Sequence, residues 1–285
     1  KNIMQKFKKS LRLQSFLITQ KKSGKSIGFV PTMGSLHEGH VSLVRKSKLE
    51  NDITVVSIYI NPSQFNDEND FLTYPKSLEN DMSLLKEIKC DTLFLPNTKE
   101  MYKDGFKPLD IDLGNLNLIL ESQKRPGHFD GVVFIVHKLF KIIDPDKAYF
   151  GEKDFQQLLI IQKLAKKHFK KTSVISCPTV RDNSGLALSS RNQKLTTKQL
   201  DFAKKVFNLL KTLKDFIKKN SVKESKVFVN DFFSQHEQIT LDYFEIIEES
   251  NFSVVNSIIK NKIYRMMIAF NVGEIRLIDN LKLKI

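Results

Sequence analysis

Two histidines near the start of the chain, His37 and His40, are the first residues whose type and spacing could do chemistry. They end the stretch 28–40, GFVPTMGSLHEGH, in which an apolar run meets a proline and a glycine. This order predicts a strand, a tight turn and the first turn of a helix. The N–H groups and the dipole at a helix start favour anions, and histidine donors can follow negative charge as it moves on a phosphate. The stretch therefore predicts a turn that binds a nucleotide.

Spacing alone leaves other interpretations of the histidine pair open. Surface histidines on a helix are common, and two histidines three residues apart can also ligate a metal. No cysteine or carboxylate set with metal-ligand spacing accompanies them in the sequence. Gly39 lies between them and leaves room for a flat ring against the helix start.

Three polar residues follow other predicted strands. Gln64 comes after the second strand, and its neutral amide could recognise a hydroxyl or a carboxylate. Lys153 and Asp154 follow a later strand and Gly151, where the lysine could face a phosphate and the aspartate could cap a helix or orient a ribose. Ligands of open α/β sheets bind beyond the carboxyl ends of the strands, where these residues are expected. Taken singly, each could equally be a solvated loop side chain.

The segment 180–192, VRDNSGLALSSRN, adds two adjacent serines and an arginine. Hydroxyl and guanidinium donors match the geometry of phosphate oxygens. With Gly185 as a flexible point, the segment could be a mobile loop that closes over a nucleotide. A polar hairpin with a helix N-cap is the alternative.

The first part of the chain alternates strands with helices. Strands are expected over 26–30, 53–60, 92–95, 109–113, 148–150 and 173–177, although Pro108 argues against the fourth. Helices are expected over 10–22, 35–50, 77–89, 130–143 and 154–169. This alternation predicts an α/β domain with a Rossmann-like, doubly wound parallel sheet over residues 1–178.

After Pro178 the pattern changes. Helices are expected over 196–219 and 223–234, and strands over 243–248, 263–270 and 275–281. A short loop containing Gly273 joins the last two strands, as in a hairpin. Residues 179–285 are therefore expected to form a smaller α+β domain with antiparallel strands.

Composition limits the classes of protein. The chain has 285 residues, 41% of them hydrophobic and 27% charged, as in ordinary globular proteins. It contains no apolar run of about 20 residues and no secretory signal after its basic start, so a cytoplasmic protein is expected. The net charge of +14 raises the alternative of a nucleic-acid-binding module, but the lysines are spread out and not interleaved with aromatic residues. Cys90 and Cys177 are expected to be buried, reduced thiols.

Together these segments resemble the pantoate–β-alanine ligase family. The resemblance rests on Pro31-Thr32-Met33-Gly34 running into the HxGH motif of His37 and His40, and on motifs that follow in the family's order over nearly the whole chain. These motifs are Asn61-Pro62-x-Gln64-Phe65, Tyr74-Pro75, Arg125-Pro126-Gly127-His128-Phe129, Phe150-Gly151-x-Lys153-Asp154-x-Gln156-Gln157, Ser189-Ser190-Arg191-Asn192 and Arg276-Leu277-Ile278-Asp279-Asn280.

The resemblance implies ATP-dependent condensation of pantoate with β-alanine through a pantoyl adenylate, with release of AMP and pyrophosphate. It implies that His40 donates a proton, that Gln64 and Gln157 hold pantoate, and that the C-terminal domain acts as a lid. The implied catalytic residues are His37, His40, Lys153, Ser189, Ser190 and Arg191. The implied ATP-binding residues are Met33, Gly34, Ser35, Leu36, His37, Glu38, Gly39, His40, Gly151, Glu152, Lys153, Asp154, Val180, Leu188, Ser189, Ser190 and Arg191. Mg²⁺ bound with the nucleotide and a homodimer are also implied.

Three positions depart from the family pattern: Leu188, Ser184 and Lys76 stand where methionine, aspartate and arginine are usual. Leucine keeps the volume and apolarity of methionine, whereas the lost aspartate could change how the loop closes and the lysine could weaken a bidentate contact. A rival interpretation is another HxGH nucleotidylyltransferase that leaves its nucleotide on the product. Only the resemblance selects pantoate as the acid.

Overall fold

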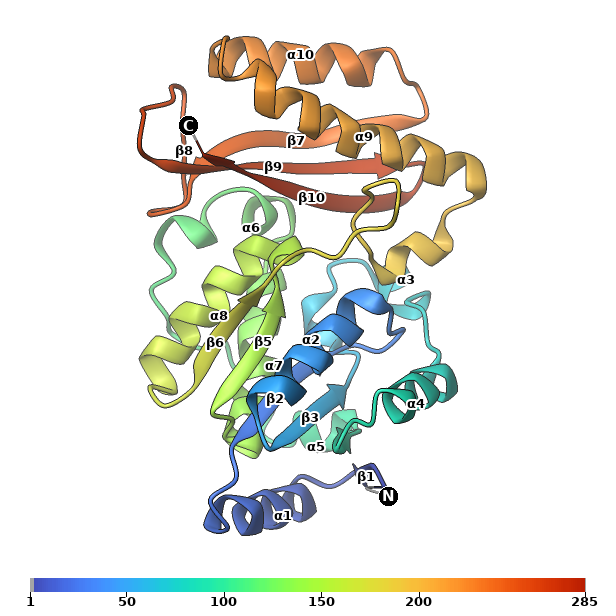
Figure 1. The fold of residues 1–285 in the computed structure, drawn as a ribbon, viewed down its shortest axis with the longest axis vertical. Coiled ribbons are helices and arrows are strands. Elements are labelled where there is room, and N and C mark those ends of the chain that lie inside the picture. The colour runs from blue at the N-terminus through green and yellow to red at the C-terminus, as the bar shows by residue number, and fades with distance from the viewer. Residues whose placement is uncertain (1–2, 285) are drawn as a thin grey trace. The chain divides into compact units, whose positions relative to one another are not determined.

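The computed structural model describes residues 3–284 (Figure 1). The chain forms two compact units, the first ending at Val180 and the second beginning at Arg181. The sequence placed a domain boundary near Pro178. Among the described residues, no helix combines the length and apolarity needed to cross a membrane.

The first unit contains a six-stranded sheet in the order β1-β4-β3-β2-β5-β6, in which every pairing is parallel. The α/β class with a parallel sheet is thereby confirmed. Its strands are β1 (Gln5–Phe7), β2 (Ile27–Thr32), β3 (Ile53–Ile58), β4 (Thr92–Phe94), β5 (Lys147–Gly151) and β6 (Ser173–Cys177). From β2 the chain builds outward to β3 and β4, and from β5 it builds the other way to β6. The strand order therefore reverses between β2 and β5, the place where open α/β sheets bind ligands.

Helices cover both faces of this sheet. The ring of Phe29 in β2 packs edge-on against Phe140, whereas Val30, which points to the opposite face, clusters with Leu43 and Val44. The helices are α1 (Ser10–Lys22), α2 (Glu38–Glu50), α3 (Glu68–Leu72), α4 (Leu78–Glu87), α5 (Thr98–Met101), α6 (Glu121–Lys124), α7 (His128–Ile143) and α8 (Phe155–His168). Short 3₁₀ segments are η1 (Pro62–Gln64), η2 (Gly114–Asn117) and η3 (Glu152–Asp154). Because Phe140 belongs to α7 and Leu43 to α2, these two helices lie on opposite faces.

Two expectations for this unit were wrong. Residues 109–113 form no strand, because Pro108 interrupts the segment and the sheet edge beside β4 is taken by β1, which the sequence did not reveal. The helix expected from residue 35 begins instead at Glu38. Gly34 and Ser35 have φ angles of 83° and 51°, in the left-handed region that a right-handed helix excludes.

The second unit pairs two helices with an antiparallel sheet. The sheet has the order β10-β9-β7-β8, built from β7 (Ile239–Glu248), β8 (Ser253–Val254), β9 (Ile263–Val272) and β10 (Ile275–Lys284). Strands β9 and β10 form the expected hairpin, with Val272 paired to Ile275 across Gly273. Helices α9 (Thr197–Phe216) and α10 (Val222–Ser234) each begin with a capping box, and η4 (Ser190–Lys194) precedes them.

Candidate nucleotide and substrate site

The turn after β2 fixes both histidines at the start of α2. His37 is the N-cap residue, and its Nδ1 accepts a hydrogen bond from the main-chain N–H of Gly39 at 3.1 Å. His40 is the third helical residue, and its Nδ1 accepts from the main-chain N–H of His37 at 3.4 Å. A main-chain N–H can only donate, so each Nδ1 carries no proton and each neutral ring holds its proton on Nε2. The turn therefore presents two Nε2–H donors.

Both histidines are neutral at pH 7. Burial is the main cause that lowers the pKa of His37 to about 4, and the Lys153 ammonium lowers it further. Burial also lowers the pKa of His40 to about 3, with further contributions from His37 and Lys153. The sequence does not determine the protonation state of these donors, and the structure selects the neutral form in the free protein.

A buried carboxylate that the sequence did not reveal holds this turn. The side chain of Asp81 in α4 accepts hydrogen bonds from the main-chain N–H groups of Ser35, at 2.8 Å, and Leu36, at 2.7 Å. Asp81 is buried, and Ser77 Oγ donates to it at 3.2 Å. These two N–H groups are therefore occupied, although the sequence suggested that N–H groups of the turn would face a phosphate. The available signal was an aspartate one helical turn before the buried Leu85, on the apolar side of α4.

Lys153 and Asp154 lie beyond β5, the sheet neighbour of β2, as the strand order requires. The Lys153 Nζ is 3.5 Å from a carboxylate oxygen of Asp154. Asp154 raises the pKa of His37 while Lys153 lowers it, so both charges act on the histidine turn. The structure thus brings the glycine–lysine–aspartate segment and the HxGH turn to one site.

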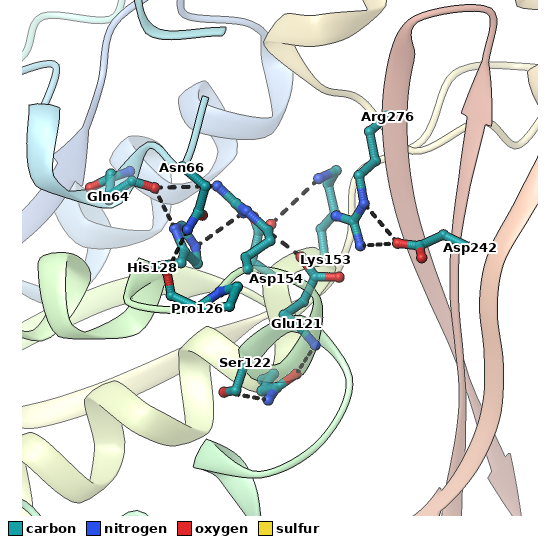
Figure 2. A network of polar contacts seen from close by, with 12 residues as sticks. Gln64, Asn66, Glu121, Ser122, Pro126, His128, Lys153, Asp154, Asp242 and Arg276 are labelled. Carbon is teal, nitrogen blue, oxygen red and sulfur yellow. Dashed lines mark hydrogen bonds and ion pairs between the residues drawn. The ribbon is translucent and has the colours of Figure 1, made fainter. Parts of the chain in front are cut away.

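Gln64 lies in η1, beyond β3, and is buried. Its Nε2 is directed at Met33 Sδ, 2.9 Å away, which connects it to the histidine turn. Its main-chain carbonyl accepts a hydrogen bond from His128 Nδ1 at 2.6 Å and from the Arg125 guanidinium at 3.3 Å. Figure 2 shows Gln64 and His128 side by side, with the Pro126 carbonyl close by accepting from Asn66. The Arg125–Phe129 motif carries part of the family resemblance, but this contact with Gln64 could not be predicted from it.

The two adjacent glutamines of α8 have different environments. Gln156 is buried, and its Nε2 donates to the carbonyls of Leu116 at 2.8 Å and Ile119 at 2.9 Å. Gln157 is half-buried, and no described residue hydrogen-bonds to its side chain. Gln156 therefore holds the preceding loop, and Gln157 is the one whose amide remains available to a ligand.

Three side chains of the predicted ATP set, those of Ser35, Glu38 and Glu152, are buried or engaged by other residues of the first unit. The Glu38 side chain is exposed and forms an ion pair with Arg45. The Ser35 side chain is fully buried. Glu152 accepts a hydrogen bond from Ser176 Oγ at 2.7 Å, and Val180, the last residue of the unit, is half-buried.

The segment 181–192 begins the second unit with an ordered turn. Arg181 pairs with Ala187 in an antiparallel bridge, and the Asp182 side chain accepts from the main-chain N–H groups of Ser184, at 2.8 Å, and Leu186, at 3.0 Å. Gly185 has a φ of 92°, and a Cβ there would lie 2.2 Å from the Phe207 ring. The glycine is therefore required by shape and backbone angle, which favours the hairpin alternative for residues 181–187.

The serines and the arginine follow this turn in η4. Ser189 is its N-cap and accepts from the main-chain N–H of Arg191 at 3.3 Å. Ser190 is buried, whereas Leu188 and Arg191 are half-buried. The other arginine of the segment, Arg181, is engaged by Asp279 at 2.7 Å. This ion pair makes Arg181 a poor candidate for a phosphate.

Side chains that could ligate a metal do not cluster in the described part of the chain. No group of three or more histidine, cysteine or carboxylate side chains within residues 3–284 could hold a metal ion. The interpretation of the two histidines as part of a protein metal centre is not supported in the described chain.

A parallel sheet whose strand order reverses beside a turn with two histidine donors and a lysine defines an α/β nucleotide-binding enzyme. The model of the pantoate–β-alanine ligase family matches residues 5–282. The chain belongs to this family, and its activity is the ATP-dependent ligation of pantoate with β-alanine.

Individual relatives agree with this assignment. The pantothenate synthetase of Flavobacterium psychrophilum is 41% identical over 98% of this chain and 99% of its own length. That of Caldicellulosiruptor saccharolyticus is 42% identical over 93% of this chain and 94% of its own.

Solved structures of relatives have the same fold. The pantothenate synthetase of Thermus thermophilus matches with a TM-score of 0.90 and 35% identity, over 99% of this chain and 100% of that one. The pantoate–β-alanine ligase of Francisella tularensis, solved in complex with β,γ-ATP and β-alanine, matches with a TM-score of 0.82 and 38% identity, over 98% and 97% of the two chains.

Proposed function

We propose that the ligation proceeds through a pantoyl adenylate formed at the HxGH turn. A carboxylate is a poor electrophile until one of its oxygens becomes part of a phosphoryl leaving group. A pantoate carboxylate oxygen attacks the α-phosphorus of ATP, the bond from that phosphorus to the β-phosphate oxygen breaks, and pyrophosphate leaves. The β-alanine amine then attacks the acyl carbon, loses a proton, and AMP leaves. The observation that carries this proposal is the pair of Nε2–H donors of His37 and His40, with Lys153 acting on both rings.

These donors suit the first step. Negative charge builds up on the phosphate oxygens as pyrophosphate departs, and pre-oriented donors stabilise that charge. Because the rings are neutral in the free protein, each would first act as a hydrogen-bond donor. The polyanionic nucleotide favours the protonated form of a nearby imidazole, which would let His40 supply a proton to the leaving group.

The substrate residues follow from the same site. Gln64 and Gln157 would hold pantoate through neutral amides. Met33 to His40, Gly151 to Asp154 and Val180 would line the ATP site, with Ser35, Glu38 and Glu152 contributing main-chain atoms. Four residues of the second unit would also contact ATP, namely Leu188, Ser189, Ser190 and Arg191. The second unit would serve as the lid that protects the mixed anhydride from water.

Mg²⁺ would enter with the nucleotide. Mg²⁺ in such enzymes is held by substrate phosphates, water and one or two carboxylates rather than by a protein cage. The lack of a three-ligand cluster among the described residues fits this arrangement. Asp154, whose side chain is 49% exposed beside Lys153, is the carboxylate best placed to share the ion. The ion would neutralise phosphate charge.

Because the chain belongs to this family, we also propose that it forms a homodimer and is located in the cytoplasm. Light scattering of the purified chain tests the assembly, since a mass near twice 33.0 kDa is expected and a monomer at working concentration contradicts it.

Product analysis tests the reaction. Phosphorus NMR of a mixture with ATP, pantoate and β-alanine should show AMP and pyrophosphate, and pantoate labelled with ¹⁸O in its carboxylate should transfer one label to AMP. ADP and phosphate would indicate an acyl phosphate instead. A stable nucleotidylated product without AMP would identify the rival nucleotidylyltransferase.

A further inference from the structure

We propose that Tyr102 is a positioning residue for pantoate binding, because its hydroxyl holds Asn61 in the place from which Asn61 orients the Gln64 amide toward the substrate. The inference rests on the proposed role of Gln64. Tyr102 follows α5, far in sequence from both residues it would control.

The orientation of Asn61 is determined by its partners. Asn61 is almost fully buried, with 1% of its surface exposed. Its Nδ2 lies 3.0 Å from the carbonyl oxygen of Gly131, which can only accept a hydrogen bond. The amide nitrogen must therefore face α7, and Oδ1 must face the opposite way, where the Tyr102 hydroxyl donates to it.

A second hydroxyl reinforces this arrangement. Ser63 Oγ lies 3.3 Å from Asn61 Oδ1 and 2.7 Å from the Tyr102 hydroxyl. A flipped Asn61 would place its oxygen against the Gly131 carbonyl, which cannot donate, whereas the two hydroxyls can bond to either end of the amide. The Gly131 carbonyl therefore selects the orientation of Asn61, and Tyr102 contributes a direct hydrogen bond that holds the side chain in place.

The orientation of the Asn61 amide determines that of the Gln64 amide. Asn61 Nδ2 also donates to Gln64 Oε1 at 3.2 Å, so the oxygen of the Gln64 amide faces Asn61. The Nε2–H₂ group of Gln64 then points away from Asn61, on the side of Met33. Gln64 consequently offers donors, which suit a hydroxyl or carboxylate oxygen of pantoate, and keeps its own oxygen away from that negative charge.

The close packing of this corner explains why it holds a single arrangement. A Cβ on Gly131 would lie 2.3 Å from the Ser63 carbonyl, so α7 and η1 approach without space for a side chain. The Tyr102 ring packs on Phe134 of α7 with centroids 5.1 Å apart. The ring supplies packing, and the hydroxyl holds Asn61 in place.

Tyr102→Phe separates these two contributions, because it keeps the ring and removes the hydroxyl. The KM for pantoate should rise about 3- to 10-fold, the loss expected for one hydrogen bond that orients a ligand group, while the KM for ATP stays unchanged. Tyr59→Phe is the matched control, since that hydroxyl contacts Thr98 Oγ1 at 3.3 Å and takes no part in the Asn61 network. It should leave both constants unchanged.

Gln64→Ala in the same assay separates failure of this inference from failure of the proposed function. If Gln64→Ala raises the KM for pantoate and Tyr102→Phe does not, the inference about Tyr102 is wrong and the role of Gln64 stands. If neither variant changes that constant, both are wrong. Equal increases for pantoate and ATP in Tyr102→Phe would indicate a general structural role and also overturn the inference.

Discussion

The imidazole rings of His37 and His40 lie with their centroids 4.1 Å apart and their planes inclined by 42°. Each Nδ1 is engaged by a main-chain N–H group. This arrangement removes the tautomeric freedom of both rings at once, so the helix start prepares two Nε2–H donors before any substrate binds. Preparation of this kind is effective because no reorganisation is needed when charge develops.

Replacing His40 should distinguish the roles of its two ring nitrogens. His40→Ala should lower the rate of adenylate formation by about 10²- to 10³-fold, the usual loss for one oriented donor to a developing oxyanion. His40→Gln places an amide near the position of Nε2 and should recover part of the rate, whereas His40→Asn places its amide near Nδ1 and should not. Pyrophosphate exchange with pantoate and ATP measures this step. Near-normal exchange in His40→Ala would contradict the role proposed for this residue.

His128 predicts a specific dependence of stability on pH. Burial, and then the Arg125 charge, lower its pKa from 6.5 to about 3 in the folded protein. Between these values the unfolded chain binds a proton that the folded chain does not, so the free energy of unfolding falls as the pH is lowered from 6.5. One such histidine contributes a slope of up to about 1.4 kcal/mol per pH unit.

His128→Asn tests that slope. Asparagine does not titrate and can still donate to the Gln64 carbonyl, so the variant should lose stability less steeply than the parent between pH 6.5 and pH 4.5. Urea unfolding at several pH values measures both proteins. The other histidines with lowered pKa values are present in each, so their contributions cancel in the comparison. Parallel curves would show that His128 does not titrate in this way.

Asp81→Asn should damage the nucleotide turn. The amide can accept one of the two main-chain hydrogen bonds, but its NH₂ group would face the other donor. We expect a loss of about 1–3 kcal/mol of stability and a higher KM for ATP. Asp91→Asn is the matched control, because Asp91 accepts from the Thr54 N–H at 3.0 Å, near the amino end of β3. It should reduce stability without changing the KM for ATP; equal effects of both variants on that constant would contradict a local role for Asp81.

The sequence predicted the sheet because its evidence is local. The β-branched run that became β3 and the helical periods of α2 and α8 are visible in single windows, and their alternation implies a parallel sheet. The strand β1 was missed because it is three residues long and is stabilised by pairing with β4, more than 80 positions away. Residues 109–113 were misread because alternation cannot reveal that a sheet edge is already occupied.

The residues of the candidate site also fall into two groups, those that the sequence could suggest and those that it could not. His37, His40, Gln64 and Lys153 follow predicted strands, so their positions marked them as candidates, and the resemblance to the ligase family selected among the possible roles. Asp81 and Tyr102 act through hydrogen bonds to residues 40 or so positions away, and no spacing rule marks such a partner. The tautomers of the two histidines also required coordinates, because they depend on which main-chain N–H meets each Nδ1.

Gly151→Ala should test the approach of the nucleotide to the end of β5. A Cβ at Gly151 would meet no atom within 4 Å, and its φ of −78° is ordinary for any residue. The substitution should therefore leave the unfolding midpoint unchanged. If ATP lies against this backbone, as proposed, the added methyl group should raise the KM for ATP by about tenfold or more, the effect of roughly 1.4 kcal/mol of lost binding.

Gly131→Ala provides the opposite control, because its Cβ would lie 2.3 Å from the Ser63 carbonyl. It should lower the unfolding midpoint as overpacking does. Thermal unfolding and initial rates at varied ATP measure both variants. An unchanged KM for ATP in Gly151→Ala would place the nucleotide away from this end of β5 and would contradict the proposed contact between ATP and residues 151–154.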